Sequence, residues 1–443
     1  MLDEARAREI FEVIRKAGAA DEVEVFLDST QSALTRFANN AIHQNVAEEG
    51  LQVSVRALVE GRTARATTNK TDEESLKRVA ERAVESARWQ PPNPDLLPMP
   101  GPQSYQPVQR YCEETAALSP DARADAVAKA IARAKSSKLT AAGILSNSMV
   151  TQVLMNSRGL YASHRETKAE FSITYLNGGS GWQKGNFTSI RQLNIEELAA
   201  RACEKALANR EPRELEPGRY TVILEPAAVL DLVGFLFYDF AGTAVLDQRS
   251  CFTGQVGKKV FGENISIWDD VFHAGQAGSP WDGEGIPRRA VPLVERGVLK
   301  NLVYARHTAR KMNAEPTGHG FLLPNEYGEA PMNLVFAGGN TSLEEMISST
   351  ERGVLVTRLW YIREVDPYEK ILTGMTRDGT FYVEGGKVRH AVRNLRFNQS
   401  LKELLNQVEL LGPAVRAAGE ESFEMVVPAM RVANFHFTEV TKY

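Results

Sequence analysis

The stretch LQVSVRALVEGRTARAT at residues 51–67 decides how the first part of the chain folds. Apolar residues occupy every second position at its start, which is the pattern of a half-buried strand. The pattern stops at Glu60-Gly61 and then resumes, as in a β-hairpin. The residues Thr71–Glu74 have the form of a capping box that opens a helix, and an amphipathic helix ending at Gly18 precedes the hairpin. These elements predict a small α+β unit.

Two segments divide the rest of the chain. Residues 90–107 contain seven prolines, so they predict an extended tether that cannot pair as a strand or continue as a helix. The segment 211–220 is charged and contains proline and glycine, which is typical of a domain boundary. We therefore expect an N-terminal α+β region at residues 1–212, made of two subdomains joined by the tether, and a C-terminal domain at residues 213–443.

The region after the tether and the C-terminal domain both show strand patterns. Residues 139–176 predict short strands with turns at Ser146-Asn147 and at 157–159. The C-terminal domain has many short β-prone runs and a helical pattern at 226–240, whose apolar stripe should be buried. That stripe consists of Leu230, Val233, Phe237 and Phe240. The predicted fold class is α+β, with a β-rich C-terminal domain around a buried helix and no doubly wound parallel sheet.

Composition excludes several classes of protein. The chain has 443 residues, 43% of them hydrophobic, and a formal net charge of −4. These are the values of an ordinary globular protein without the basic surface that nucleic-acid binding requires. No apolar run approaches the ~18 residues of a spanning helix, and no signal peptide begins the sequence. Three widely spaced cysteines support neither a disulfide framework nor a cysteine zinc cluster, so we expect a cytoplasmic protein.

Several stretches, in the same order and spacing, resemble the TldD/PmbA family. The similar stretches lie at residues 37–88, 250–261, 281–321 and 381–405. This family comprises two-domain proteins often called modulators of DNA gyrase, and the resemblance spans nearly the whole chain. It implies a TldD/PmbA-like fold, an association with peptidase activity, and a dimer around an internal cleft that unfolded peptides enter.

The resemblance also implies where a zinc site would lie. TldD-like chains carry a helical H-E-x-x-x-H motif and a late cysteine ligand, whereas PmbA-like (TldE) chains lack the motif. In EPAAVLDLVGFLFYDFAG, residues 225–242, the motif positions fall on Leu230, Asp231 and Phe235. Leucine and phenylalanine offer no donor to zinc, and no cysteine follows Cys251. We therefore expect a PmbA/TldE-like chain with no metal, no other cofactor and no catalytic residue of its own.

Two other places are candidates for cleft lining. Gly318, His319 and Gly320 resemble a family loop that lines the cleft, although a tight turn with an exposed imidazole is the more common meaning of such a pattern. Trp182 follows a glycine-rich run, where an aromatic side chain can grip a peptide or pack as a plug between domains. No pair of histidines has the spacing of a helical metal site.

Acidic residues of the C-terminal half could instead form a different active site. Asp269-Asp270, Asp282 and Glu284 could act as acid and base, although acids beside glycine more often form turns. Asp231, Asp269, Asp270 and His319 keep open the alternative that the chain is a metal-independent hydrolase with a replaced active site.

The leading functional hypothesis is a non-catalytic subunit, or pseudoenzyme, of a cytoplasmic TldD-type system for proteolysis. Its partner would be a zinc-bearing TldD-like chain or a second copy in a homodimer, formed through the aromatic-rich C-terminal half. A regulatory protein that acts on DNA gyrase is the third hypothesis. We expect that the protein binds neither a membrane nor nucleic acid.

Overall fold

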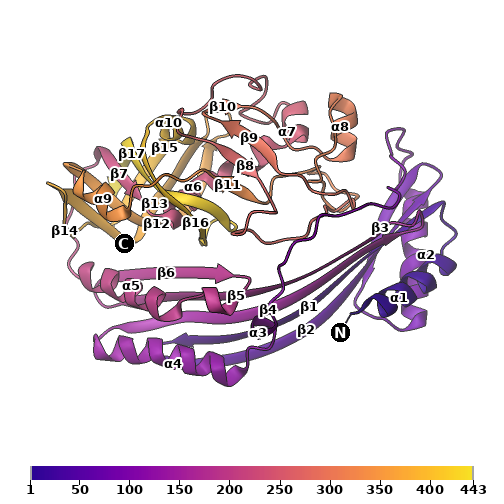
Figure 1. Ribbon diagram of the computed structural model, residues 1–443, viewed down its shortest axis with the longest axis horizontal. Coiled ribbons are helices and arrows are strands. Elements are labelled where there is room, and N and C mark those ends of the chain that lie inside the picture. Colours follow the sequence, from indigo (N-terminus) through magenta and orange to yellow (C-terminus); the bar gives the residue numbers. More distant parts are fainter. Residues whose placement is uncertain (1, 442–443) are drawn as a thin grey trace.

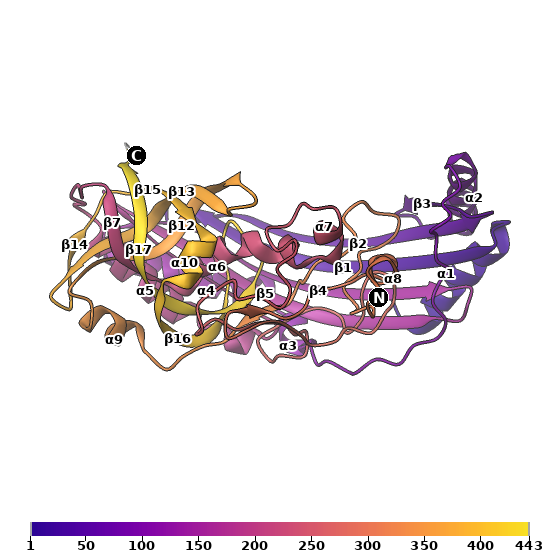
Figure 2. The same cartoon turned by 90° about the horizontal axis from the view of Figure 1, so that it is seen from above.

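The computed structural model describes residues 2–441, which form two β-sheets. Figure 1 shows the C-terminal sheet lying over one face of the long N-terminal sheet, while α4 lies on the opposite side. Seen from above in Figure 2, the molecule is elongated, with α1 and α2 at one end and the C-terminal strands towards the other. Within residues 2–441, none of the helices has the length and apolar character that a membrane crossing requires.

The N-terminal sheet is antiparallel throughout, in the order β3-β2-β1-β4-β5-β6. Its strands are β1 (Glu22–Ala38), β2 (Ala41–Val59), β3 (Arg62–Thr68), β4 (Thr140–Asn156), β5 (Tyr161–Leu176) and β6 (Ser180–Phe187). The predicted hairpin is confirmed, with Glu60 and Gly61 turning at φ of 47° and 72°. The turn predicted at Ser146-Asn147 is wrong, because β4 pairs with β1 on one side and β5 on the other, and this pairing overrides the local turn preference.

Helices cover one face of this sheet as two separate groups. They are α1 (Glu4–Ala17), α2 (Glu73–Trp89), α3 (Glu113–Ala116), α4 (Pro120–Ser136), the 3-10 helix η1 (Ile190–Gln192) and α5 (Ile195–Ala208). Helices α1 and α2 share a core with the ends of β1, β2 and β3. Helices α4 and α5 share a second core around Phe37 and Phe171. Asp72, rather than Thr71, caps α2 by accepting a hydrogen bond from the Ser75 amide at 2.9 Å.

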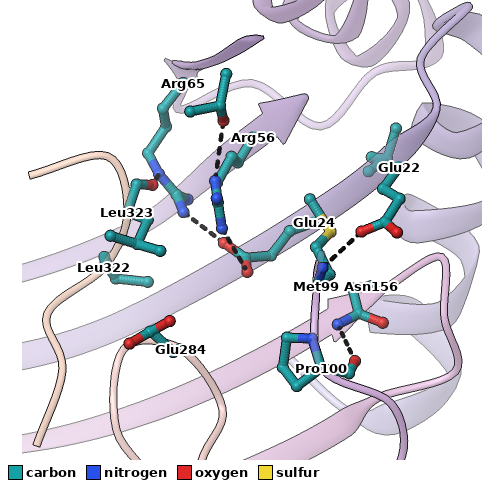
Figure 3. A network of polar contacts seen from close by, with 12 residues as sticks. Glu22, Glu24, Arg56, Arg65, Met99, Pro100, Asn156, Glu284, Leu322 and Leu323 are labelled. Carbon is teal, nitrogen blue, oxygen red and sulfur yellow. Dashed lines mark hydrogen bonds and ion pairs between the residues drawn. The ribbon is translucent and has the colours of Figure 1, made fainter. Parts of the chain in front are cut away.

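The proline-rich segment is extended, as predicted, and it packs against the sheet. The Met99 amide donates to the Glu22 carboxylate at 2.6 Å, and Asn156 Nδ2 donates to the Pro100 carbonyl at 2.8 Å (Figure 3). The parts of the chain on either side of the tether also contribute strands to one continuous sheet. The tether is therefore a packed strap and not the only link between them, and the domain limits given above stay predictions.

The C-terminal sheet has eleven strands and is mixed. Its strands are β7 (Gly218–Leu224), β8 (Ile267–Asp269), β9 (Val291–Glu295), β10 (Val298–Leu299), β11 (Leu334–Phe336), β12 (Arg352–Asp366), β13 (Ile371–Glu384), β14 (Lys387–Ala391), β15 (Leu395–Ser400), β16 (Val408–Ala417) and β17 (Met425–Val440). Only β7 with β12 and β11 with β17 pair in parallel among the described strands. The sheet is not doubly wound, and the predicted α+β class is confirmed.

The predicted helix at 226–240 is present as α6 (Pro226–Val233) followed by the 3-10 helix η2 (Gly234–Phe240). The other helices of this half are α7 (Gly242–Leu246), α8 (Arg306–Met312), α9 (Leu343–Ser348) and α10 (Leu401–Asn406). Leu230, Val233 and Phe240 have no exposed surface, which confirms most of the predicted stripe. Phe237 is the exception: the change from α- to 3-10 geometry leaves it only partly buried, against Phe423.

Candidate functional site

The motif helix α6 follows directly from strand β7, which pairs with β12 on one side and β17 on the other, and these pairings fix the position of the helix. Proline at its first position presets the backbone for the helix. Leu230 and Asp231 are fully buried, while Phe235, one turn further on, is partly buried. The structure therefore directs the first two motif positions into the core and leaves only the third near solvent.

Asp231 is a buried acid with an incomplete set of partners. Its Oδ1 accepts a hydrogen bond from the Glu421 amide at 3.3 Å, and its Oδ2 has no hydrogen-bond partner among the described residues. The loop at 419–421 passes so closely that a Cβ on Gly419 would clash with Oδ1. Burial raises the pKa of Asp231 to about 7, well above the 3.8 of a free aspartate.

A cavity of about 510 Å³ lies beside Phe235. Aromatic side chains of η2 and the loop at 420–423 line it, and Lys370 lies in its wall. Lys370 forms ion pairs with Asp239 and, at 2.7 Å, with Glu364. These charges outweigh the effect of burial and raise the pKa of Lys370. The cation is therefore held as a charged structural group and not as a base.

Cys251 lies next to this ion pair and is not reactive in character. Burial, followed by the neighbouring Asp239 charge, raises the pKa of its thiol. A hydrogen bond with the Ser189 hydroxyl instead lowers the pKa of Cys112, which is partly exposed. We expect iodoacetamide at pH 8 to modify Cys112 first, because the thiolate is the nucleophile, and Cys251 only after unfolding. Peptide mapping by mass spectrometry measures this order, and faster labelling of Cys251 would contradict it.

The loop around His319 lies inside the C-terminal domain. His319 is 1% exposed; its Nε2 lies 2.8 Å from Asp269 Oδ1 and its Nδ1 lies 2.9 Å from the Thr317 hydroxyl. Burial alone would raise the pKa of Asp269, but the His319 side chain outweighs it and the pKa is lowered. Gly318 has φ of 76° and packs against the Pro287 carbonyl.

The carboxylates singled out in the sequence therefore divide into separate groups. Asp269 pairs with His319, as described, while Asp270 accepts a hydrogen bond from the Phe272 amide in a turn. Asp282 accepts hydrogen bonds from the amides of its own loop and from the Gly320 amide at 2.7 Å. The imidazole was expected to be exposed on a tight turn or to line a cleft. Its hydrogen bond with Asp269, fifty residues earlier in the chain, explains why it is buried instead.

Trp182 lies on strand β6 and not on a mobile loop. It is 3% exposed, and the Arg358 guanidinium lies 4.8 Å from the centre of its ring. Arg358 belongs to β12, so the contact joins the two sheets. The glycine-rich run before Trp182 is a tight turn between β5 and β6, because those strands pair up to Leu176 and Ser180.

A second polar cluster, not singled out as a site by the sequence, joins the two halves. Glu24 is 1% exposed; Arg65 Nη2 lies 2.5 Å from it and Arg56 Nη1 lies 3.7 Å from it (Figure 3). Arg65 Nε also donates to the Leu323 carbonyl at 2.6 Å, so the N-terminal sheet holds a C-terminal loop. Burial and the Asp282 charge raise the pKa of nearby Glu284 to about 7.

Models of one family match most of the chain. The PmbA/TldA metallopeptidase C-terminal domain matches residues 217–439, domain 1 matches residues 23–87, and the central domain matches residues 112–210. The chain belongs to the PmbA/TldD metallopeptidase family.

Individual relatives of this PmbA/TldD family chain agree with the assignment. Metalloprotease PmbA of Escherichia coli O157:H7 is 22% identical over 438 residues, which cover 94% of this chain and 93% of that protein. A metalloprotease of Methanothermobacter thermautotrophicus is 27% identical over 289 residues, covering 60% of this chain and 61% of the relative. The crystal structure of TldE from Thermococcus kodakarensis has a TM-score of 0.88 at 22% identity, over 98% of this chain and 100% of that one. The TldD/PmbA-like fold is thereby shown.

Zinc, the metal that a metallopeptidase family implies, does not fit the donors of this chain. At the positions that the resemblance assigns to the motif, the side chains of Leu230 and Phe235 supply no nitrogen, oxygen or sulfur atom, and only Asp231 has a donor atom. Among residues 2–441 no group of three or more His, Cys, Asp or Glu side chains is arranged to hold a metal ion. No reaction step through a metal can be assigned to the motif helix of this PmbA/TldD family member.

Proposed function

We propose that this chain is a PmbA/TldE-like, non-catalytic subunit of a cytoplasmic TldD-type metallopeptidase system. The observation that carries the proposal is the pair of apolar residues, Leu230 and Phe235, at the two positions that the family resemblance assigns to metal ligands. Leu230 is packed in the core, so this helix contributes to stability. In a zinc-bearing chain the same helix would supply metal ligands. The likeness to TldE supports the fold on which this role depends.

The proposed partner is a zinc-bearing TldD-like chain, with a homodimer as the alternative assembly. Besides the aromatic-rich C-terminal half expected from the sequence, an exposed edge in the N-terminal sheet supports association with another chain. Residues 41–52 of β2 are largely exposed on both faces, and among the described strands only β1 pairs with them. Exposed strand edges pair readily with other chains or with extended peptides. Cleavage of unfolded peptides would then belong to the assembly and not to this chain.

Mixing the purified chain with a zinc-bearing TldD-like chain tests this role. We expect size-exclusion chromatography with light scattering to detect a complex heavier than the 49.0 kDa chain. Peptide cleavage by the mixture should exceed cleavage by the zinc chain alone. A monomer whose elution is unchanged by the sister chain, together with unchanged cleavage, would contradict the proposal.

A further inference from the structure

A cavity of about 280 Å³ lies where the N-terminal sheet, the proline-rich strap and the C-terminal domain meet. Its wall includes Arg56 from β2, Asn93 and Leu97 from the strap, and Glu284 and His307 from the C-terminal domain. It is separate from the cavity beside the motif helix, because the two share no lining residue. The volume suits a small molecule rather than a chain of folded protein.

Arg56 is a buried cation in the wall of this cavity. It is 3% exposed, and its Nε donates to the Thr63 hydroxyl at 3.1 Å. Its Nη1 also forms a long ion pair with Glu24 at 3.7 Å, which is beyond hydrogen-bonding distance. A guanidinium has five N–H donors, and Arg56 lines the cavity, so it can donate to an acceptor bound there.

Arg56 shares its counter-ion with a second arginine. Arg56 and Arg65 share one buried carboxylate, Glu24, and Arg65 holds it in the closer contact. Figure 3 shows the two guanidinium groups converging on Glu24, with Glu284 on the facing loop. Glu284 is buried beside Asp282, and this keeps it from being a fully charged counter-ion at neutral pH. The wall also contains Glu326 and Asp95, and Asp95 is paired with Arg310 and Lys311. Beside Arg56 itself, the shared Glu24 is its only ion-pair partner among the described residues, so an anion in the cavity would give this guanidinium a second one.

The remaining wall defines the kind of anion that fits. Leu96, Leu97, Leu323 and Pro324 supply apolar surface beside the guanidinium. A guanidinium fork matches the two oxygens of a carboxylate, and the apolar wall suits an aliphatic body. We propose that this inter-domain cavity binds a small aliphatic carboxylate, with Arg56 holding the carboxylate group. The proposal does not depend on whether the chain is catalytic.

Isothermal titration calorimetry on the full chain tests the site with 4-methylpentanoate and inorganic phosphate as probes. A short peptide ending in leucine, with a free or an amidated C-terminus, distinguishes a free acid from a peptide end as the source of the carboxylate. We expect saturable one-site binding of a carboxylate probe, weaker binding of phosphate and none of the amide. Absence of carboxylate binding at millimolar concentrations, or equal binding of the amidated peptide, would overturn the proposal.

Two substitutions assign the binding to the cavity. Arg56→Met should weaken binding at least about tenfold, the effect of losing one hydrogen bond to a charged group. Arg62→Met, on the same hairpin but outside the cavity wall, is the matched control and should bind as the wild type does. Equal affinity of Arg56→Met and wild type would show that the ligand, if any, binds elsewhere.

Glu284→Gln keeps the proposal testable if Arg56→Met fails to fold. Ionised Glu284 would repel the ligand, so wild-type affinity should fall about tenfold between pH 6 and pH 8. Asp282, Arg306 and Arg56 are the charged groups that face Glu284, and burial lowers the pKa of His307 in the same wall, which keeps that imidazole neutral over most of this range. Glu284→Gln should bind equally at both pH values, and an unchanged pH dependence would contradict the assignment.

Discussion

Replacing Asp231 with asparagine is expected to stabilise the folded chain by about 1–3 kcal/mol at pH 8. Burial raises the pKa of this acid from 3.8 to about 7, and a tenfold change in proton affinity corresponds to about 1.4 kcal/mol of free energy. Above pH 7 the folded chain must hold a charged, partly unsatisfied carboxylate that the unfolded chain exposes to water. Asparagine has the same shape and no charge, so it removes the cost of the buried charge, about 4 kcal/mol. Its amide nitrogen would be a buried donor at a position without a partner among the described residues, which offsets about 1–3 kcal/mol of that gain.

The same substitution should remove a pH dependence of stability. Below pH 4 Asp231 is protonated in both states, and between about pH 4 and pH 7 only the folded state keeps the proton. Unfolding then releases a proton, so the stability of the wild type falls as the pH rises through this window. Urea denaturation from pH 4 to pH 8 measures the effect, with Asp125→Asn on the exposed face of α4 as the control. If the Asp231→Asn variant is no more stable than the wild type at pH 8, ionised Asp231 does not destabilise the folded chain, and the prediction is wrong.

Phe240→Ala is expected to destabilise the C-terminal domain by about 3–5 kcal/mol, the usual effect of removing a buried aromatic ring. Phe240 has no exposed surface and lies 4.9 Å from Phe252, measured between ring centres. Removing the ring leaves a void that the surrounding sheet cannot close. Phe237→Ala is the matched control: Phe237 lies in the same helix but borders the cavity, so its loss should cost clearly less. If urea denaturation showed the same loss of stability for both variants, the difference in burial between Phe240 and Phe237 would be contradicted.

Local patterns in the sequence predicted the elements whose contacting residues lie close together in the sequence. The hairpin at 51–67 and the buried helix at 226–240 could be predicted, because a strand or helix shows its buried face in its own periodicity. The expectation for Phe237 failed because the helix changes to 3-10 geometry at Gly234, and this rotates the following side chains away from the predicted stripe. No spacing pattern in the sequence predicts this change of helix geometry.

Such local patterns could not predict contacts between residues that are far apart in the sequence. The predicted turn at Ser146-Asn147 is straight strand because β4 has a partner on each side, which local preference cannot reveal. His319 meets Asp269, and Arg65 meets both Glu24 and the Leu323 carbonyl, across large separations in the chain. The sequence did hold one signal for this cluster, because Arg56 and Glu24 are charged residues within strand patterns. Only the fold shows that both side chains are buried and lie close together.

The zinc content of the purified chain, measured together with its cleavage of an unfolded peptide, tests the central claim most directly. After incubation with zinc and removal of loosely bound metal, we predict zinc well below one ion per chain and no cleavage by the chain alone. Leu230 and Phe235 cannot coordinate the metal, so added zinc should not change this result. Stoichiometric zinc accompanied by robust cleavage that a chelator abolishes would contradict the claim that this chain is non-catalytic.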